Sequence, residues 1–218
     1  MNFNWSIENF DRYKKIACII SLFGVIQFLF LTFLAAFFYP GGYDYFNYFF
    51  SDLGAEMARN GELNLISSSL FFITLIGISI CFIPFWLISH ILFVNKYSNL
   101  LSKIGLVLGL SSTPFIITIA LCPLDIKFEL HLIASLIVLF DFMIAIFLYS
   151  IAIIISGKYS KSLGFIGFAV VVVSIGLIIN PFAPYGAFLQ KIIFYCYFSW
   201  VLIPTYLVWN SNREKSIT

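Results

Sequence analysis

Long apolar stretches separated by short polar ones dominate this chain. Six of them are long enough, or nearly so, to form helices that cross a membrane, because a helix needs about 20 apolar residues to span the hydrocarbon core. They are 16–39, 65–94, 104–121, 130–156, 163–180 and 188–209. The stretches are continuous and do not alternate with a period of two, which favours helices over the strands of a barrel. The pattern predicts an all-α, polytopic integral membrane protein, a six-helix bundle forming one transmembrane domain over residues 1–218.

Composition supports this assignment and removes several function classes. Hydrophobic residues make up 61% of the chain and charged residues 10%, against about 25% charged residues in an ordinary soluble domain. The net charge of +2 comes without a basic arm, so nucleic acid is not an expected partner and membrane lipids are. The four cysteines stand singly, without a C-x-x-C motif, and therefore indicate no zinc or redox site. We expect no cofactor and no metal.

Positive charges alternate between the loops. Lys and Arg residues number nine in the N-terminal segment, the second and fourth loops and the tail, and three in the first, third and fifth connections. By the positive-inside rule, both termini are predicted to lie in the cytoplasm, with the protein in the cell membrane. An even number of spans agrees with this orientation.

Two polar stretches, 39–70 and 122–131, are then predicted to lie on the outer side and to face each other. We expect a polar pocket between them that binds a lipid headgroup, a small solute or a cation. A structural network joining the first loop to the fourth helix is the alternative. The candidate ligand-binding residues on this side are Asp52, Glu56, Asn64, Asp125, Glu129 and His131.

The same residues allow an enzymatic alternative, an outer-leaflet lipid-modifying hydrolase. Ser51 would be its nucleophile and His131 its general base, oriented by Asp125 and assisted by Asp52. No motif defines a reaction class, so the sequence favours a protein that is not an enzyme. His131 also has Ser135 one helical turn away as a possible hydrogen-bond partner.

Asp141 is predicted to lie near the middle of the fourth helix, close to the bilayer midplane. A charged residue there costs at least about 2.5–3.5 kcal/mol on insertion scales. Two interpretations stay open. One is a proton or cation site, as in a small proton-coupled transporter; the other is a neutral side chain bonded to a neighbouring hydroxyl.

Small residues and prolines carry further predictions about the helices. Gly105 and Gly109 have the spacing that allows close helix contact, either within the bundle or in a homo-oligomer formed through this face. Pro84 and Pro114 are candidate kinks. Asn180 and Pro181 are predicted to end the fifth helix.

Short motifs along the chain resemble a known family. Ser51-Asp52-Leu53-Gly54 follows the first helix, Asn64 precedes the second, and Pro123-x-Asp125 ends the third just before His131. This arrangement resembles the six-helix prokaryotic membrane proteins grouped as "domain of unknown function 998", with the Frag1/DRAM/Sfk1 group as a second candidate. The resemblance implies six spans and no established reaction. Ceramidase-like membrane hydrolases are similar only in combining Ser, Asp and His; they use three zinc-binding histidines, and this chain has two.

Overall fold

The computed structural model describes residues 7–179 and 185–211, and all the long elements in these ranges are helices. They are α1 (Ile7–Phe37), η1 (Phe50–Gly54), α2 (Leu65–Ser89), η2 (His90–Leu92), α3 (Lys96–Leu121), α4 (Phe128–Ser156), α5 (Lys161–Ile179), α6 (Gly186–Trp200) and α7 (Leu202–Asn210). In the described ranges the only strand-like pairing is one isolated bridge between Met57 and Leu63. The predicted all-α class is confirmed.

Six helical spans are long and apolar enough to cross a membrane, as the sequence predicted. Four are single helices, α1, α3, α4 and α5; α2 continues into η2, and α6 and α7 together form the last span. Large apolar side chains cover the outside of the bundle, and many of them are more than half exposed. Such a surface matches lipid as the surrounding solvent, so the chain is a multi-pass membrane protein.

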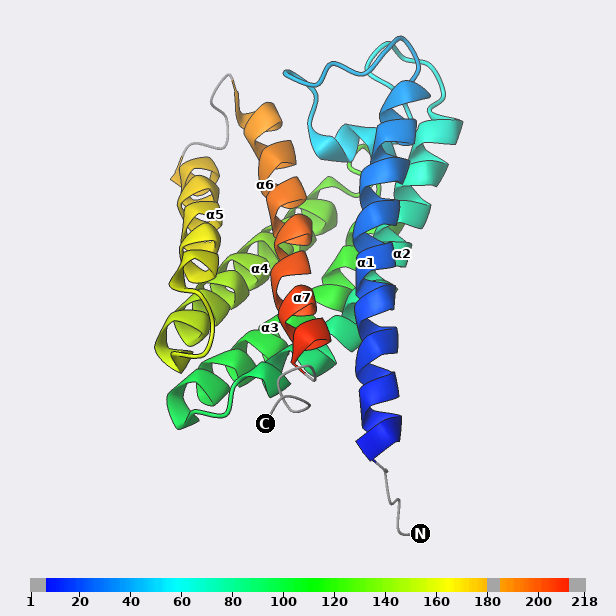
Figure 1. Ribbon diagram of the computed structural model, residues 1–218. Helices are drawn as coiled ribbons and strands as arrows, with labels where there is room; N and C mark the ends of the chain where they lie inside the picture. Colours follow the sequence, from blue (N-terminus) through cyan, green and yellow to red (C-terminus); the bar gives the residue numbers. More distant parts are fainter. Residues whose placement is uncertain (1–6, 180–184, 212–218) are drawn as a thin grey trace.

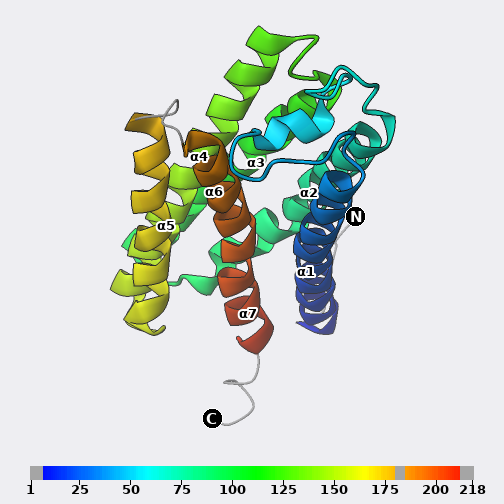
Figure 2. The same cartoon turned by 90° about the horizontal axis from the view of Figure 1, so that it is seen from above.

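The helices run up and down in sequence order (Figure 1). α1 and α2 pack together on one side, α5 packs on α6 on the other, and the tightly packed pair α3 and α4 lies behind them, as Figure 2 also shows. α1 begins and α7 ends at the same end of the bundle. We call the opposite end, which carries residues 38–64 and 122–127, the loop end, and we call residues 38–64 the cap.

Glycines let α3 approach its neighbours closely. A Cβ atom on Gly105 would lie 2.7 Å from the Tyr149 ring of α4, and one on Gly109 would lie 2.1 Å from the Trp86 ring of α2. The close contact predicted for this face therefore occurs inside one chain, where two large aromatic side chains occupy it. A homo-oligomer stays a prediction, and it needs another surface.

The predicted helix ends differ from the observed ones where polar residues begin a helix. α3 starts at Lys96, eight residues before the predicted 104. Asn95 caps it by accepting the Tyr97 N–H at 3.0 Å. Ser98 and Ser102 are buried in the first turns and donate to the Asn95 and Asn99 carbonyls, so these polar residues belong to the helix.

Prolines act differently in different helices. α2 and α3 continue through Pro84 and Pro114. The predicted helix 188–209 is divided into α6 and α7 at Val201, because Pro204 has no N–H to donate to the Trp200 carbonyl four residues earlier. The predicted helix end at Asn180 and Pro181 lies outside the described residues.

Candidate functional site

The cap is held together by the Asp52 carboxylate. Arg59 donates to it twice, from Nε to Oδ1 at 2.9 Å and from its terminal nitrogen to Oδ2 at 3.1 Å. The Phe49 N–H also donates to Oδ2, at 2.6 Å. The hydrogen bonds that the Arg59 guanidinium donates to Asp52 raise the pKa of this guanidinium above its usual range. Asp52 is buried, with 4% of its surface exposed, so its three acceptor contacts stabilise the cap and are turned away from any ligand.

Asn64 joins the cap to the start of α2. Its side chain has no exposed surface, and its Nδ2 donates to the Leu53 carbonyl at 3.1 Å and the Ala55 carbonyl at 2.9 Å. Ser67 donates to the same Leu53 carbonyl at 3.0 Å. The sequence singled out Asn64 as a ligand-binding candidate, but the structure uses its amide to bind the backbone that follows η1.

Asp125 connects the two polar stretches. Its carboxylate accepts the Glu56 N–H at 3.2 Å and the Met57 N–H at 3.0 Å. This contact confirms the prediction that the first loop and the α3–α4 connection face each other. Glu56 and Glu129 are exposed at this end, and neither carboxylate pairs with a cation of the described chain.

His131, in the first turn of α4, is a predicted site residue with a ring nitrogen that no other described residue bonds, and the buried Asn64 Oδ1 is likewise without a partner in the described chain. Only 4% of it is exposed, and its Nδ1 lies 2.7 Å from the Cys122 carbonyl. A carbonyl oxygen accepts only, so Nδ1 must carry the hydrogen and the lone pair of the neutral ring lies on Nε2. No other described residue forms a hydrogen bond to Nε2. The sequence suggested Asp125 as the group that orients this ring and Ser135 as a possible hydrogen-bond partner; the partner found among the described residues is the Cys122 carbonyl.

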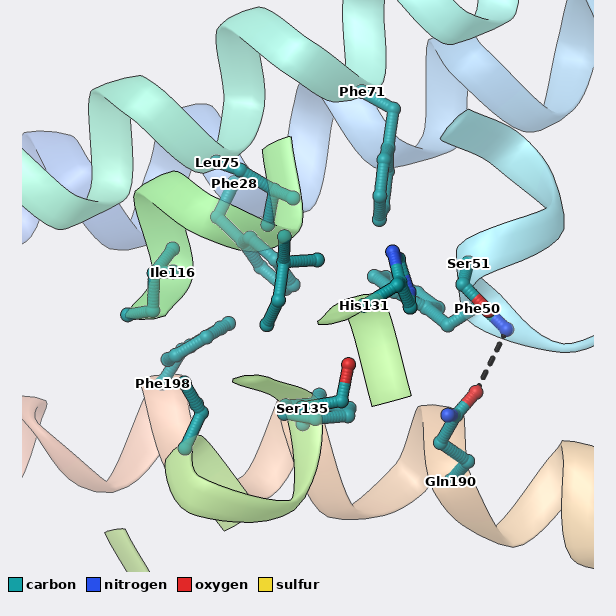
Figure 3. Close-up of a pocket in the computed structure, with 13 residues that line it drawn as sticks. Phe28, Phe50, Ser51, Phe71, Leu75, Ile116, His131, Ser135, Gln190 and Phe198 are labelled. Carbon is teal, nitrogen blue, oxygen red and sulfur yellow. Dashed lines mark hydrogen bonds between the residues drawn. The ribbon is translucent and has the colours of Figure 1, made fainter. Parts of the chain in front are cut away.

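His131 lines a small cavity between the helices at the loop end (Figure 3). Its other polar lining residues are Ser51 from η1, Ser135 from α4 and Gln190 from α6. The remaining wall is apolar, and much of it consists of phenylalanine rings. The aromatic lining residues are Phe28, Phe50, Phe71, Phe194 and Phe198. The cavity measures about 40 Å³, which is room for a small polar group or a few waters.

The predicted catalytic set is only partly assembled around this cavity. Ser51 and His131 both line it, whereas Asp52 and Asp125 do not. Each carboxylate is bonded within the cap, as described above. The arrangement thus contains a hydroxyl and an oriented imidazole without the carboxylate that the hydrolase hypothesis assigned to the imidazole.

Gln190 and Lys191 are two site residues that sequence reasoning missed. Gln190 accepts the Phe50 N–H at 2.8 Å, shown as the dashed line in Figure 3. Lys191 is 3% exposed; it donates to the Tyr48 carbonyl and to the Ala187 carbonyl, and its ammonium lies 5.3 Å from the centre of the Tyr43 ring. In the sequence, Lys191 stood out only as one of the three positive charges of the loop end. Two adjacent polar residues inside an apolar span are the signal that could have marked both as site residues, although it could not have named their partners.

Asp141 lies away from this cavity, on the boundary between α3 and α4. Its Oδ2 is 2.7 Å from the Ser111 hydroxyl, and both residues are partly exposed. The predicted hydrogen bond to a neighbouring hydroxyl is therefore present. Among the described residues, no group of three or more His, Cys, Asp or Glu side chains is placed to bind a metal.

Comparisons of this chain with protein-family models, with curated proteins and with solved structures find no match. The resemblance to the "domain of unknown function 998" group stays a prediction, and the argument for function rests on the contacts described above.

Proposed function

We propose that this chain is a binding protein of the cell membrane whose cavity at the loop end, facing outward, recognises the hydrogen-bond-donating end of a small ligand. That donor is a hydroxyl or an ammonium group, carried by a lipid headgroup or by a free solute. The proposal includes membership of the six-helix group to which the sequence motifs are similar.

The observation that carries this proposal is the state of His131. Its Nδ1–H is bonded to the Cys122 carbonyl, which leaves the Nε2 lone pair of a nearly buried ring without a partner in the described chain. Nε2 is not one of the fully buried polar atoms that lack a partner in the described chain, so it keeps some accessible surface toward the cavity. A ligand or water in the cavity can therefore donate a hydrogen bond to Nε2, and the cavity favours a donor.

The rest of the cavity wall suits a compact donor attached to an apolar body. The Ser51 and Ser135 hydroxyls and the Gln190 amide supply further hydrogen bonds, while the phenylalanine rings offer apolar contact and attract cations to their faces. About 40 Å³ accommodates the terminal group and not a whole headgroup. The remainder of the ligand would extend away from the cavity.

Binding has more support than hydrolysis. Asp52 is paired with Arg59, and Asp125 accepts two backbone N–H groups, so neither carboxylate is available to His131. The His131 ring is oriented by the Cys122 carbonyl, so the pair of Ser51 and His131 lacks the carboxylate that stabilises the imidazolium in a Ser-His-Asp triad.

Two observations support the outward orientation of the loop end. The sequence puts nine of the twelve Lys and Arg residues at the end where α1 begins and α7 ends, or in the adjoining terminal segments. Of the other three, Arg59 is paired with Asp52 and Lys191 is buried against carbonyls.

Nitrogen NMR of the two histidines in lipid nanodiscs tests the ligand. The chain contains only His90 and His131, so ¹⁵N-histidine labelling yields two sets of ring signals. Nanodiscs of phosphatidylethanolamine present an ammonium that donates hydrogen bonds, whereas the quaternary ammonium of phosphatidylcholine has no N–H. If a lipid headgroup is the ligand, the chemical shift of His131 Nε2 differs between phosphatidylethanolamine and phosphatidylcholine nanodiscs. If a free solute is the ligand, adding ethanolamine to phosphatidylcholine nanodiscs changes this chemical shift.

Single variants assign the signals and complete the test. His131→Asn removes one signal set and His90→Asn the other. A His131 signal identical in all three conditions would overturn recognition of an ammonium donor. A shift that persists in Ser135→Ala combined with Gln190→Leu would show that those two residues take no part.

A further inference from the structure

The Asp141–Ser111 contact carries an inference separate from the cavity at the loop end. Ser111 Oγ lies 2.7 Å from two oxygens, Asp141 Oδ2 and the Leu108 carbonyl. A serine hydroxyl has one hydrogen and can therefore donate to only one of them. Two oxygens this close need a hydrogen between them, because otherwise two sets of lone pairs face each other.

The second hydrogen has one available source, the carboxyl group itself. When Asp141 is protonated, it donates to Ser111 Oγ, and Ser111 donates to the Leu108 carbonyl. The three groups then form a chain in which every donor has an acceptor. We propose that Asp141 is a neutral carboxylic acid and that the Asp141–Ser111 pair is a proton-binding site in the membrane core.

The depth of Asp141 agrees with this proposal. It is the fourteenth of the 29 residues of α4, which is the middle of a membrane-competent helix. The Asp141 side chain is partly exposed on the surface of α4. Phe140 and Ile144 are its neighbours on this helix surface, and each of these apolar side chains is 40% exposed, as expected for a surface that faces lipid. Hydrocarbon provides no water to stabilise a carboxylate, so the neutral acid is favoured there.

No charged side chain of the described chain pairs with Asp141, which takes part in neither ion pair. On α4 itself, Glu129 and His131 are twelve and ten residues away, about 18 and 15 Å along the helix. On α3 the nearest charge is Lys103, eight residues before Ser111 and about 12 Å along that helix.

The other neighbours of α4 also leave Asp141 unpaired. α5 has its one charged residue, Lys161, at its first position, and α6 has only Lys191, which is bonded to the Tyr48 and Ala187 carbonyls. Protonation is thus the way for Asp141 to avoid an unpaired negative charge in this position and to supply the hydrogen between its Oδ2 and Ser111 Oγ.

Infrared spectroscopy of the full chain in nanodiscs tests the proposal. A protonated carboxyl has a C=O band separate from those of carboxylates and amides. At neutral pH we expect such a band in the wild-type protein, its loss in Asp141→Asn, and a shift in Ser111→Ala, which removes the hydrogen bond. Glu129→Gln is the matched control, because this exposed residue of the same helix should leave the band unchanged.

Labelling by a hydrophobic carbodiimide supplies an independent measurement, since this reagent partitions into lipid and reacts with protonated carboxyl groups. Peptide mass spectrometry is expected to find the adduct on Asp141, with less adduct as the pH rises. A spectrum without a carboxylic acid band that depends on Asp141, together with the absence of the adduct, would overturn the proposal. Ser111→Ala tests the pair even if Asp141→Asn folds poorly.

Discussion

Asp52 in the cap and Asp141 on α4 are both removed from bulk water, yet their surroundings differ in kind. Asp52 accepts from an arginine side chain at two points and from one backbone N–H. In the part of the chain that the structure describes, Asp141 has a single hydroxyl contact and no cation beside it. The comparison teaches that two carboxyl groups removed from water can differ widely in the number and charge of their donors, and this difference is what the proposed neutral state of Asp141 rests on.

The difference extends to the regions around each residue. The cap buries a few apolar residues, among them Phe50 and Leu53, and is also held by polar side chains bonded to its backbone groups, those of Asn64, Asp125 and Lys191. The α3–α4 boundary is held by close packing of Gly105 against the Tyr149 ring, and its one polar contact at Asp141 is the hydrogen bond with Ser111. Removing donors should therefore damage the cap much more than the boundary.

The largest expected effect is from Asn64→Asp. Nδ2 of Asn64 donates to two buried carbonyls, and an aspartate would replace this donor by a third acceptor. We expect the free energy of unfolding to fall by about 3 kcal/mol. SDS titration in mixed micelles, followed by far-UV circular dichroism, measures the loss.

Asn60→Asp is the matched control for that change. Asn60 is exposed, and its Oδ1 accepts the Glu62 N–H, a role that aspartate keeps. Its effect should stay within about 0.5 kcal/mol. Equal losses in the two variants would contradict the donor role of Asn64.

A somewhat smaller effect is expected from Arg59→Met, which keeps the length of the side chain but removes its charge. Asp52 would remain nearly buried with one N–H donor, and we expect a loss of about 2 kcal/mol because the half-exposed Arg59 pair is partly screened by water. Adding Asp52→Asn should restore at least half of this loss in the same titration. Additive losses would show that the two side chains act independently.

Asp141→Asn should change the free energy of unfolding by less than about 1 kcal/mol, because an amide keeps one donor and one acceptor as the neutral acid does. The same SDS titration compares this variant with Asp52→Asn, whose loss should be larger. A loss above about 2 kcal/mol for Asp141→Asn would indicate an ionised carboxylate with a structural role, and would remove the contrast between the two regions.

The smallest effect concerns Asp44 at the surface of the cap. The Asn47 side chain and the N–H groups of Phe46 and Asn47 lower the pKa of this carboxyl below its ordinary value. Its contribution to cap stability is present above the unfolded pKa, about 4, and is lost as the pH falls through the folded pKa. The side-chain amide NMR signal of Asn47 should titrate with a midpoint below that ordinary value. Asp44→Asn should abolish the titration, and a midpoint at or above about 4 would contradict the contact.

Local patterns were sufficient for some parts of the molecule. Apolar length predicted six spans, because lipid requires each crossing segment to satisfy its own backbone. The polar residues between them predicted that 39–70 and 122–131 meet, and Asp125 makes that contact. The start of α3 was missed, since Ser98 and Ser102 read as loop residues until their hydrogen bonds to preceding carbonyls are known.

Partners distant in sequence were beyond prediction. Gln190 and Phe50 are 140 positions apart, as Ser111 and Asp141 are 30 apart, and nothing in the spacing pairs them. The Cys122 carbonyl that orients His131 is a backbone atom, and every residue has one. Such contacts depend on how helices rotate and lean in the packed bundle.

The sequence by itself determined that this chain is helical, that six of its segments are long and apolar enough to cross a membrane, and that six of its ten acidic residues lie in the stretches 39–70 and 122–131. The length of an apolar segment and its turn residues act locally, so the helices and turns that they specify can be predicted directly from the sequence. Only the tertiary structure decided which polar atoms form hydrogen bonds within the chain. The Asp52 carboxylate accepts from Arg59, and the Asn64 Nδ2 donates to backbone carbonyls. His131 Nε2, by contrast, has no hydrogen-bond partner among the described residues. The physical reason is that a hydrogen bond requires its donor and acceptor atoms to lie about 3 Å apart. Atoms of segments that are remote in the sequence come this close only through packing.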